Sequence, residues 1–273
     1  METVKNPEDI KNLKENKVIG EITLEKSEIK FYGVNNIFYC DSGIKLKNSN
    51  INFVGNNSIV YLSYTDKDYV LEVYVRHDST IFIGKNNELG APFKINVQES
   101  QNLIIGEDNV IGNDVFVRTI DTYPIYDMNT KERINYSESV FIGDHVWIDH
   151  FTYISRGVKI GSGAIVGVRS FIHPYATVYS NTYVMGNPVV TVEKDVFFTK
   201  NFVGVFTAED TEINSVYNTD LFIYDFVSNE TLSMENIDKI LKSLPVEDRL
   251  EFIQKLFVRN KRKNRFSIRS FRL

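Results

Sequence analysis

The sequence has little of what would tie a protein to a membrane or to an oxidising compartment. Cys40 is its only cysteine, so no disulfide can form within the chain, which is typical of a reducing compartment. No apolar run approaches the roughly 20 residues of a membrane-spanning helix. The polar start, 1–7, lacks the apolar centre of a signal peptide. We therefore expect a cytoplasmic protein.

The net charge and the lack of certain short motifs argue against several classes of protein and site. With 36 acidic and 31 basic residues the net charge is -5, so the overall surface gives no reason to expect nucleic acid binding. The sequence has no metal-ligand spacing, no phosphate-binding Gly-Lys-Ser/Thr sequence and no serine nucleophile elbow. We expect neither a metal nor a nucleic acid partner.

The sequence does have an unbroken period of six residues, in which Ile or Val recurs eight times. These positions are Ile142, Ile148, Ile154, Ile160, Val166, Ile172, Val178 and Val184. An α-helix would need apolar residues at a period of about 3.6, whereas short fixed repeats are typical of a β-helix. Each hexad gives one short strand with an inward aliphatic side chain, and coils must stack to bury it.

The repeat is weaker toward the N-terminus, where Gly33 recurs as Gly55 with a shift of 22 residues. We expect a parallel β-helix over 18–195, after a loose lead-in at 1–17. The hexad phase breaks after Val117. A polar insertion of 13 residues, 123–135, precedes its return, and insertions of this kind project from a solenoid as loops.

The C-terminal extension, 196–273, has a different pattern. Apolar residues at helical spacing, with Ser233 as the N-cap, predict helices at about 233–260. The last 15 residues, 259–273, hold seven Lys or Arg and no acid. This basic tail is either a solvated end or a site of weak association with an anionic membrane surface or polymer.

Three segments carry a resemblance to a known family: Ile142-Gly143-Asp144-His145-Val146-Trp147-Ile148, residues 157–164, and Gly186-Asn187-Pro188. The chain resembles the hexapeptide-repeat acyltransferases and, more narrowly, the sugar and polysaccharide O-acetyltransferases. The resemblance implies a mainly β fold, namely a left-handed parallel β-helix with a projecting loop and a small C-terminal α-helical region. It also implies acetyl-CoA as co-substrate, a carbohydrate acceptor and a homotrimer.

In the resembling enzymes the loop carries a histidine base within a motif close to Arg-Thr-Ser-Asp-x-His. This chain reads Arg118-Thr119-Ile120-Asp121-Thr122-Tyr123, with tyrosine at the histidine position. A phenol with a pKa near 10 is a poor base at neutral pH. By the resemblance, we expect Arg118 and Tyr123 to contact the substrate and Asp121 to take part in catalysis.

His150 is the residue that we expect to replace the missing base. Assigning successive hexads to three faces puts the corner after Ile148 above Thr119-Ile120, at the root of the loop. His145, on the previous corner, is assigned to substrate binding. The alternative for His150 is a solvated surface histidine.

Trp147 and the segments after it are assigned by the resemblance. Trp147 is expected to line the acetyl site, although a subunit interface would also explain an outward indole. Gly167 and Arg169 fall in the slot for CoA, where Arg169 would either pair with a phosphate or narrow the slot. The cofactor-binding end motif is Gly186, Asn187 and Pro188.

These features predict an O-acetyltransferase that moves acetyl from acetyl-CoA to a sugar hydroxyl. The acceptor class is a surface polysaccharide of capsular or lipopolysaccharide type, or its precursor. Two alternatives stay open. One is a catalytically silent relative that serves as a binding or scaffold subunit, and the other is an N-acetyltransferase of a nucleotide amino sugar.

Overall fold

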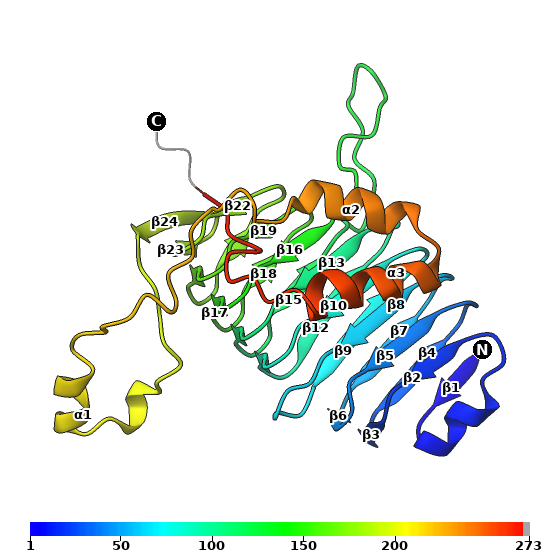
Figure 1. The fold of residues 1–273 in the computed structure, drawn as a ribbon. Coiled ribbons are helices and arrows are strands. Elements are labelled where there is room, and N and C mark those ends of the chain that lie inside the picture. The colour runs from blue at the N-terminus through cyan, green and yellow to red at the C-terminus, as the bar shows by residue number, and fades with distance from the viewer. Residues whose placement is uncertain (270–273) are drawn as a thin grey trace.

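The computed structural model describes residues 1–269 and shows a three-sided β-helix with helices along one side (Figure 1). Sheet 1 consists, in spatial order, of β1 (Glu2–Val4), β4 (Glu28–Phe31), β7 (Asn50–Phe53), β9 (Leu71–Val75), β12 (Phe93–Val97), β15 (Phe116–Arg118), β18 (Tyr153–Ile154) and β21 (Phe171–Ile172). Sheet 2 consists of β2 (Lys17–Ile19), β5 (Ile37–Cys40), β8 (Ile59–Leu62), β10 (Thr80–Ile83), β13 (Asn102–Ile105), β16 (Val140–Ile142), β19 (Lys159–Ile160) and β22 (Thr177–Val178).

Sheet 3 is shorter and lies in the C-terminal half of the solenoid. It consists of β11 (Glu88–Leu89), β14 (Val110–Ile111), β17 (Trp147–Ile148), β20 (Ile165–Val166), β23 (Thr182–Gly186) and β24 (Val189–Lys194). A two-stranded sheet, β3 (Ile22–Glu25) with β6 (Ile44–Lys47), precedes it on the third side. Strands of successive coils are parallel, whereas β1 pairs antiparallel with β4 and β24 antiparallel with β23.

The hexad period describes the core of the C-terminal coils. Ile142 pairs with Ile160 and Ile160 with Val178, so one coil takes 18 residues, or three hexads. The eight Ile and Val positions of the repeat are all buried in one continuous cluster. Each such side chain contributes about 1.5–3 kcal/mol by leaving water. Farther toward the N-terminus the coils lengthen, and Ile37 pairs with Ile59, 22 residues on.

The lead-in at 1–17 is ordered, so the expectation of a loose segment was wrong. β1 pairs antiparallel with β4, and a 3-10 helix, Pro7–Asn12, follows it. Val4 is fully buried at this end of the solenoid. The segment closes the first coil, a role that its polar composition does not reveal.

The projecting loop is longer than the sequence pattern indicated. Val117 pairs with Ile154 in sheet 1, whereas Ile142 pairs with Ile105 in sheet 2. The chain therefore goes from Val117 directly to the next face at Ile142, a step of 25 residues instead of six, so 19 residues are inserted rather than 13. Tyr136 belongs to this insertion, which projects above α2 in Figure 1.

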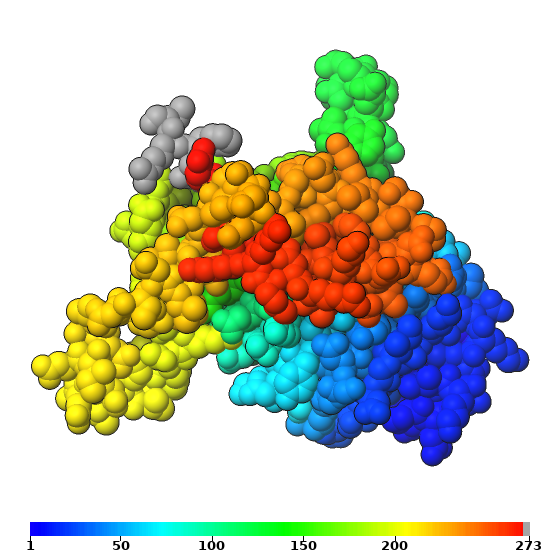
Figure 2. All heavy atoms as spheres, in the orientation of Figure 1, coloured from blue at the N-terminus to red at the C-terminus, as the bar shows by residue number. Residues whose placement is uncertain are grey.

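The C-terminal extension covers one face of the solenoid. After a short α1 (Ala208–Ile213), the chain forms α2 (Met234–Ser243), α3 (Val246–Ile253) and a π-helical turn, Gln254–Val258. Outward aromatic residues of sheet 2 pack against these helices. The extension lies over the solenoid in orange and red in Figure 2. Among the described residues, no helix has the length and apolar content needed to span a membrane.

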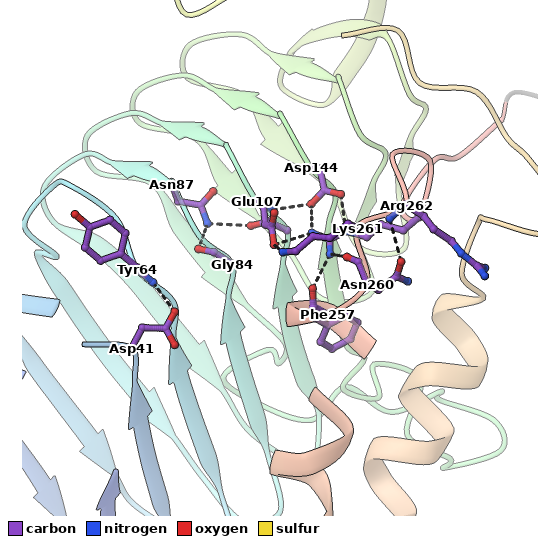
Figure 3. A network of polar contacts seen from close by, with 12 residues as sticks. Asp41, Tyr64, Gly84, Asn87, Glu107, Asp144, Phe257, Asn260, Lys261 and Arg262 are labelled. Atoms are coloured by element: carbon purple, nitrogen blue, oxygen red, sulfur yellow. Dashed lines mark hydrogen bonds and ion pairs between the residues drawn. The ribbon is translucent and has the colours of Figure 1, made fainter. Parts of the chain in front are cut away.

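The described part of the basic tail is fixed to the solenoid. Arg265 is buried and donates from Nε and NH2 to the Asp144 carboxylate at 2.7 and 2.8 Å. Its NH1 donates to the carbonyl oxygens of Phe257 and Asn260 at 2.6 and 2.7 Å. Figure 3 shows Asp144, Phe257 and Asn260 converging on this network. The interpretation of the tail as merely a solvated end is therefore wrong at Arg265, although Lys261 to Lys263 are exposed, and Arg272 lies outside the described residues.

Candidate active site

A pocket of about 340 Å³ lies where three coils turn from sheet 3 into sheet 1. Its lining comes from the ends of β11, β14 and β17 and from one turn of an earlier coil. The lining residues are Lys67, Glu88, Leu89, Gly90, Val110, Ile111, Gly112, Asn113, Trp147, Asp149 and His150. Two of the predicted site residues, Trp147 and His150, are thus brought together.

Glycine forms the floor of this corner because adjacent coils approach closely. A Cβ at Gly112 would lie 2.6 Å from the backbone nitrogen of His150, and one at Gly90 would lie 2.3 Å from the carbonyl carbon of Gly112. Gly167 occupies the same position two coils after Gly112. The same position holds Asp149 in the coil between them and Met185 in the coil after Gly167, and the Asp149 side chain turns outward into the pocket.

Trp147 faces outward from β17, between Val110 and Ile165 of the neighbouring strands. Its indole is 38% exposed and lies 5.8 Å from the ring of Phe198, measured between centroids. A half-exposed, fixed indole offers a flat apolar surface and one N–H donor. The expected role in lining the site is therefore compatible with its position.

His150 is oriented by the coil before it. Its Nδ1 accepts a hydrogen bond from the backbone N–H of Asn113 at 2.7 Å. The neutral ring then carries its proton on Nε2, so this imidazole offers the pocket a donor rather than a lone pair. Nε2 is 3.7 Å from Oδ1 of Asp149, beyond a hydrogen bond.

The predicted position of His150 above Thr119-Ile120 was also wrong. The ring accepts a hydrogen bond from Asn113 of the preceding coil, and the loop root lies at a different corner, between sheets 1 and 2. The error follows from the six residues by which the insertion was undercounted, because they shift every later hexad by one face.

The predicted residues Arg118, Asp121 and Tyr123 do not line the pocket of their own chain. Arg118 donates to Asp121 at 3.1 Å, and Asp121 also accepts from Asn135 at 3.1 Å. These contacts tie the two ends of the loop together. Tyr123 lies beyond them and is 77% exposed.

His145 is buried, so its assignment to substrate binding was wrong. Its ring lies between those of Phe198 and Phe222, with centroids 4.3 and 4.0 Å away. Nδ1 pairs with Asp108 at 2.7 Å and Nε2 with the carbonyl of Phe198 at 3.1 Å. Although burial opposes it, hydrogen bonds from His145 and Lys200 hold the pKa of Asp108 below its usual value. His145 anchors the C-terminal extension.

The residues assigned to CoA follow one corner from the pocket to the end of the solenoid. The backbone N–H of Arg169 donates to the carbonyl of His150 at 2.9 Å, and its guanidinium lies 5.7 Å from the Phe151 ring. The N–H of Gly186 donates to Oγ of Ser170 at 3.2 Å. Asn187 and Pro188 form the turn between β23 and β24.

Sequence reasoning missed two residues that shape the site. Asn113 sets the tautomer of His150, and Lys67 reaches the pocket from an earlier coil. Asn113 could have been identified if the length of the loop had been counted correctly. It precedes His150 by 37 residues, the same step that relates Val110 to Trp147. Lys67 lies in a turn outside the hexad repeat.

Comparison with known proteins supports the repeat and the fold. Residues 139–174 match the family model described as bacterial transferase hexapeptide (six repeats). The resemblance drawn from 142–188 is thereby confirmed for the repeat itself. The polysialic-acid-specific acetyltransferase NeuO has a similar crystal structure, with a TM-score of 0.60 at 24% identity over 74% of this chain and 94% of that chain. This similarity confirms the predicted fold class, a mainly β solenoid.

Two curated relatives are polysialic acid O-acetyltransferases. The one from Escherichia coli O1:K1 is 27% identical over 146 residues, which cover 54% of this chain and 47% of the relative. The one from Neisseria meningitidis is 25% identical over 131 residues, which cover 48% of this chain and 60% of the relative. The chain therefore spans about half to three fifths of the length of these relatives.

Proposed function

We propose that this protein transfers acetyl from acetyl-CoA to a sugar hydroxyl of a surface polysaccharide, of capsular or lipopolysaccharide type, or of its precursor. The observation that carries the proposal is the pocket beside Trp147, which lies on the same corner of the solenoid as Gly167 and, one coil later, the segment before Gly186. Acyl transfer needs a slot for the thioester, donors for the developing oxyanion and an apolar platform for the acceptor. The relatives that act on polysialic acid support an acidic polysaccharide as acceptor.

The proposed site for acetyl-CoA lies along the corner at which successive coils turn from sheet 3 into sheet 1. Acetyl-CoA would lie along the corner at Gly167, where the glycine has no side chain of its own to project over the coils. Arg169 stands on this path with its guanidinium near Phe151. A guanidinium in this place would pair with a CoA phosphate.

The assembly that we propose is a cytoplasmic homotrimer with its sites between subunits. The loop with Tyr123 leaves from one corner of the solenoid and the pocket with His150 lies at another. A second copy would bring its loop to this pocket, and cyclic symmetry closes such an interface without filaments. Light scattering at the mass of one 31.5 kDa chain would contradict the trimer.

A silent scaffold subunit is the second candidate, favoured by tyrosine at position 123. One assay separates the candidates: incubation with acetyl-CoA and purified acidic or neutral glycans, while free thiol is followed. Acetyl release by mild alkali distinguishes an ester from the amide that an amino-sugar N-acetyltransferase would form. Thiol release that depends on a glycan supports the enzyme, and its absence together with absent acetyl-CoA binding supports the scaffold.

Association of exposed tail cations such as Lys261 and Lys263 with an anionic surface is an additional proposal. Exposed charges are screened over about 10 Å at 0.1 M salt, so such binding would be weak and salt-sensitive. Lys261→Gln together with Lys263→Gln should reduce sedimentation with anionic vesicles at low salt. Unchanged sedimentation would reject it. The double substitution spares Arg265, whose loss would disturb the fold.

A further inference from the structure

The pocket needs a base that neither His150 nor Tyr123 supplies within one chain. Nδ1 of His150 is occupied by the N–H of Asn113, and Tyr123 lies at another corner. The titratable residues that line this pocket are Lys67, Glu88, Asp149 and His150. Acetyl transfer to a hydroxyl requires one group that can accept a proton at the reacting centre.

Asp149 is the lining residue with an available lone pair. Glu88 pairs with Lys200 at 3.4 Å, and Lys67 is a cation whose ammonium lies 3.7 Å from Asp66. Oδ1 of Asp149 accepts from the backbone N–H of His150 at 2.7 Å. Among residues 1–269, no hydrogen bond reaches its Oδ2.

The position of Asp149 makes this carboxylate unusual in the fold. Gly90, Gly112 and Gly167 occupy the same corner position in other coils of sheet 3. In the coil after Gly167 this position is Met185, so among these five coils Asp149 alone places an ionisable group here, and its side chain is 26% exposed toward the pocket. The carboxylate thus lies in the same pocket lining as Trp147, at a position that is glycine in the two coils before it and in the coil after it.

We propose that Asp149 is the base for the acceptor hydroxyl and that His150 is a hydrogen-bond donor to the oxyanion. The inference rests on the proposed acetyl transfer and adds its proton path. The acceptor oxygen bonds to the thioester carbonyl carbon while its proton moves to Oδ2 of Asp149. Nε2–H of His150 donates to the resulting oxyanion. The carbon–sulfur bond then breaks, and the CoA thiolate takes the proton from Asp149, which leaves an ester and a free thiol.

Substitutions at Asp149 test the base directly. Asp149→Asn keeps the shape and removes the proton acceptor, so turnover should fall at least about 10²-fold, while acetyl-CoA binding measured by calorimetry stays within about threefold. Asp149→Gly introduces the glycine that this position holds in the neighbouring coils and should be equally slow. Added formate should then recover part of its turnover, because the small carboxylate enters the space that the side chain leaves.

Substitutions at His150 test the donor. Glutamine can accept from Asn113 and still present an N–H to the pocket, so His150→Gln should keep turnover within about tenfold of wild type. His150→Ala should lose about 10²-fold, as removal of one oxyanion donor does. The matched control is His173→Gln, an exposed histidine outside the pocket lining, which should leave turnover unchanged.

The outcomes separate this inference from the proposed function. If Asp149→Asn turns over like wild type, Asp149 is not the base, although acetyl transfer stands. If Asp149→Gly is inactive and formate restores nothing, the carboxylate has a structural role and the inference is rejected. If the wild type neither releases thiol with any glycan nor binds acetyl-CoA, the proposed function and this inference fall together.

Discussion

The backbone N–H of Asn113 donates to Nδ1 of His150 at 2.7 Å and so joins two successive coils at the mouth of the pocket. This single bond fixes the ring and places its remaining proton on Nε2. A residue predicted to be a base is thereby presented as a donor. The chemistry of the corner depends on coil register as much as on residue type.

Trp147 should matter for the acceptor more than for the fold, because its ring is outward and only partly covered by Phe198. We expect Trp147→Ala to raise the KM for glycan about tenfold or more, since stacking surface is lost. The KM for glycan of Trp147→Phe should lie between those of the wild type and Trp147→Ala. Steady-state kinetics at fixed acetyl-CoA measures the effect.

The matched control for Trp147 is Tyr32→Ala. Tyr32 is another exposed aromatic residue, outside the pocket lining and in an early coil. Its loss should leave the KM for glycan unchanged. Equal effects of the two substitutions would show that Trp147 acts through general surface properties and not through the site.

Arg265→Ala should destabilise the protein strongly. The guanidinium is 2% exposed and pairs with the Asp144 carboxylate, which would be left without its cation. Breaking a buried pair from one side costs about 3–5 kcal/mol. The free energy of unfolding in urea measures this loss. The control is Arg262→Ala, at a neighbouring exposed arginine that donates to the backbone carbonyl of Asn229, and it should lower the free energy of unfolding by less than about 1 kcal/mol. Equal losses for the two variants would show that the Arg265–Asp144 pair does not stabilise the fold.

Acid should release the segment around Phe198 and Phe222. Asp108 holds His145, and the pKa of Asp108 is lowered because the hydrogen bonds from His145 and Lys200 outweigh burial. A carboxyl whose pKa is lower in the folded state stabilises the fold above its unfolded pKa of about 4. That contribution is lost as the pH falls through the lower folded value.

Asp108→Asn makes this prediction measurable. The difference in unfolding free energy between wild type and variant should be present at neutral pH and should shrink below about pH 4. Trp147 is the only tryptophan and lies beside Phe198, so its fluorescence also reports the release. A difference that stays constant down to acid pH would contradict the assigned contact.

The sequence predicted the coil interior well and the surface of the coils poorly, for a physical reason. Burial forces an aliphatic residue at every sixth position from Ile142 to Val184, so the pattern is visible in one chain. The polar loop between Val117 and Ile142 is not required to place an aliphatic residue at a fixed period. The sequence pattern therefore could not show how many residues are inserted there. The burial of His145 depends on two phenylalanines more than 50 residues away, which follow no period.

Tyr123→His tests whether a second copy completes the site. The loop leaves from the corner between sheets 1 and 2, so its tip reaches a pocket only if that pocket belongs to a neighbouring chain. In a trimer with sites between subunits, a new imidazole would add a base with a pKa near 6.5. Turnover should then rise, by up to about 10²-fold given the value of general-base catalysis. Tyr123→Phe should change turnover little, because a neutral phenol is not the base.

The decisive form of this experiment places the two changes in different chains. Asp149→Asn chains with tyrosine at position 123 should be nearly inactive, whereas Tyr123→His chains retain Asp149 and should keep at least wild-type turnover. Co-expressed under two affinity tags, Asp149→Asn and Tyr123→His chains should form mixed trimers in which some Asp149→Asn pockets face a histidine loop. Activity above that of mixed trimers of Asp149→Asn and wild-type chains would support loop exchange. If the Tyr123→His protein stays at wild-type turnover and light scattering gives a single 31.5 kDa chain, the loop does not reach a pocket and the intersubunit site is rejected.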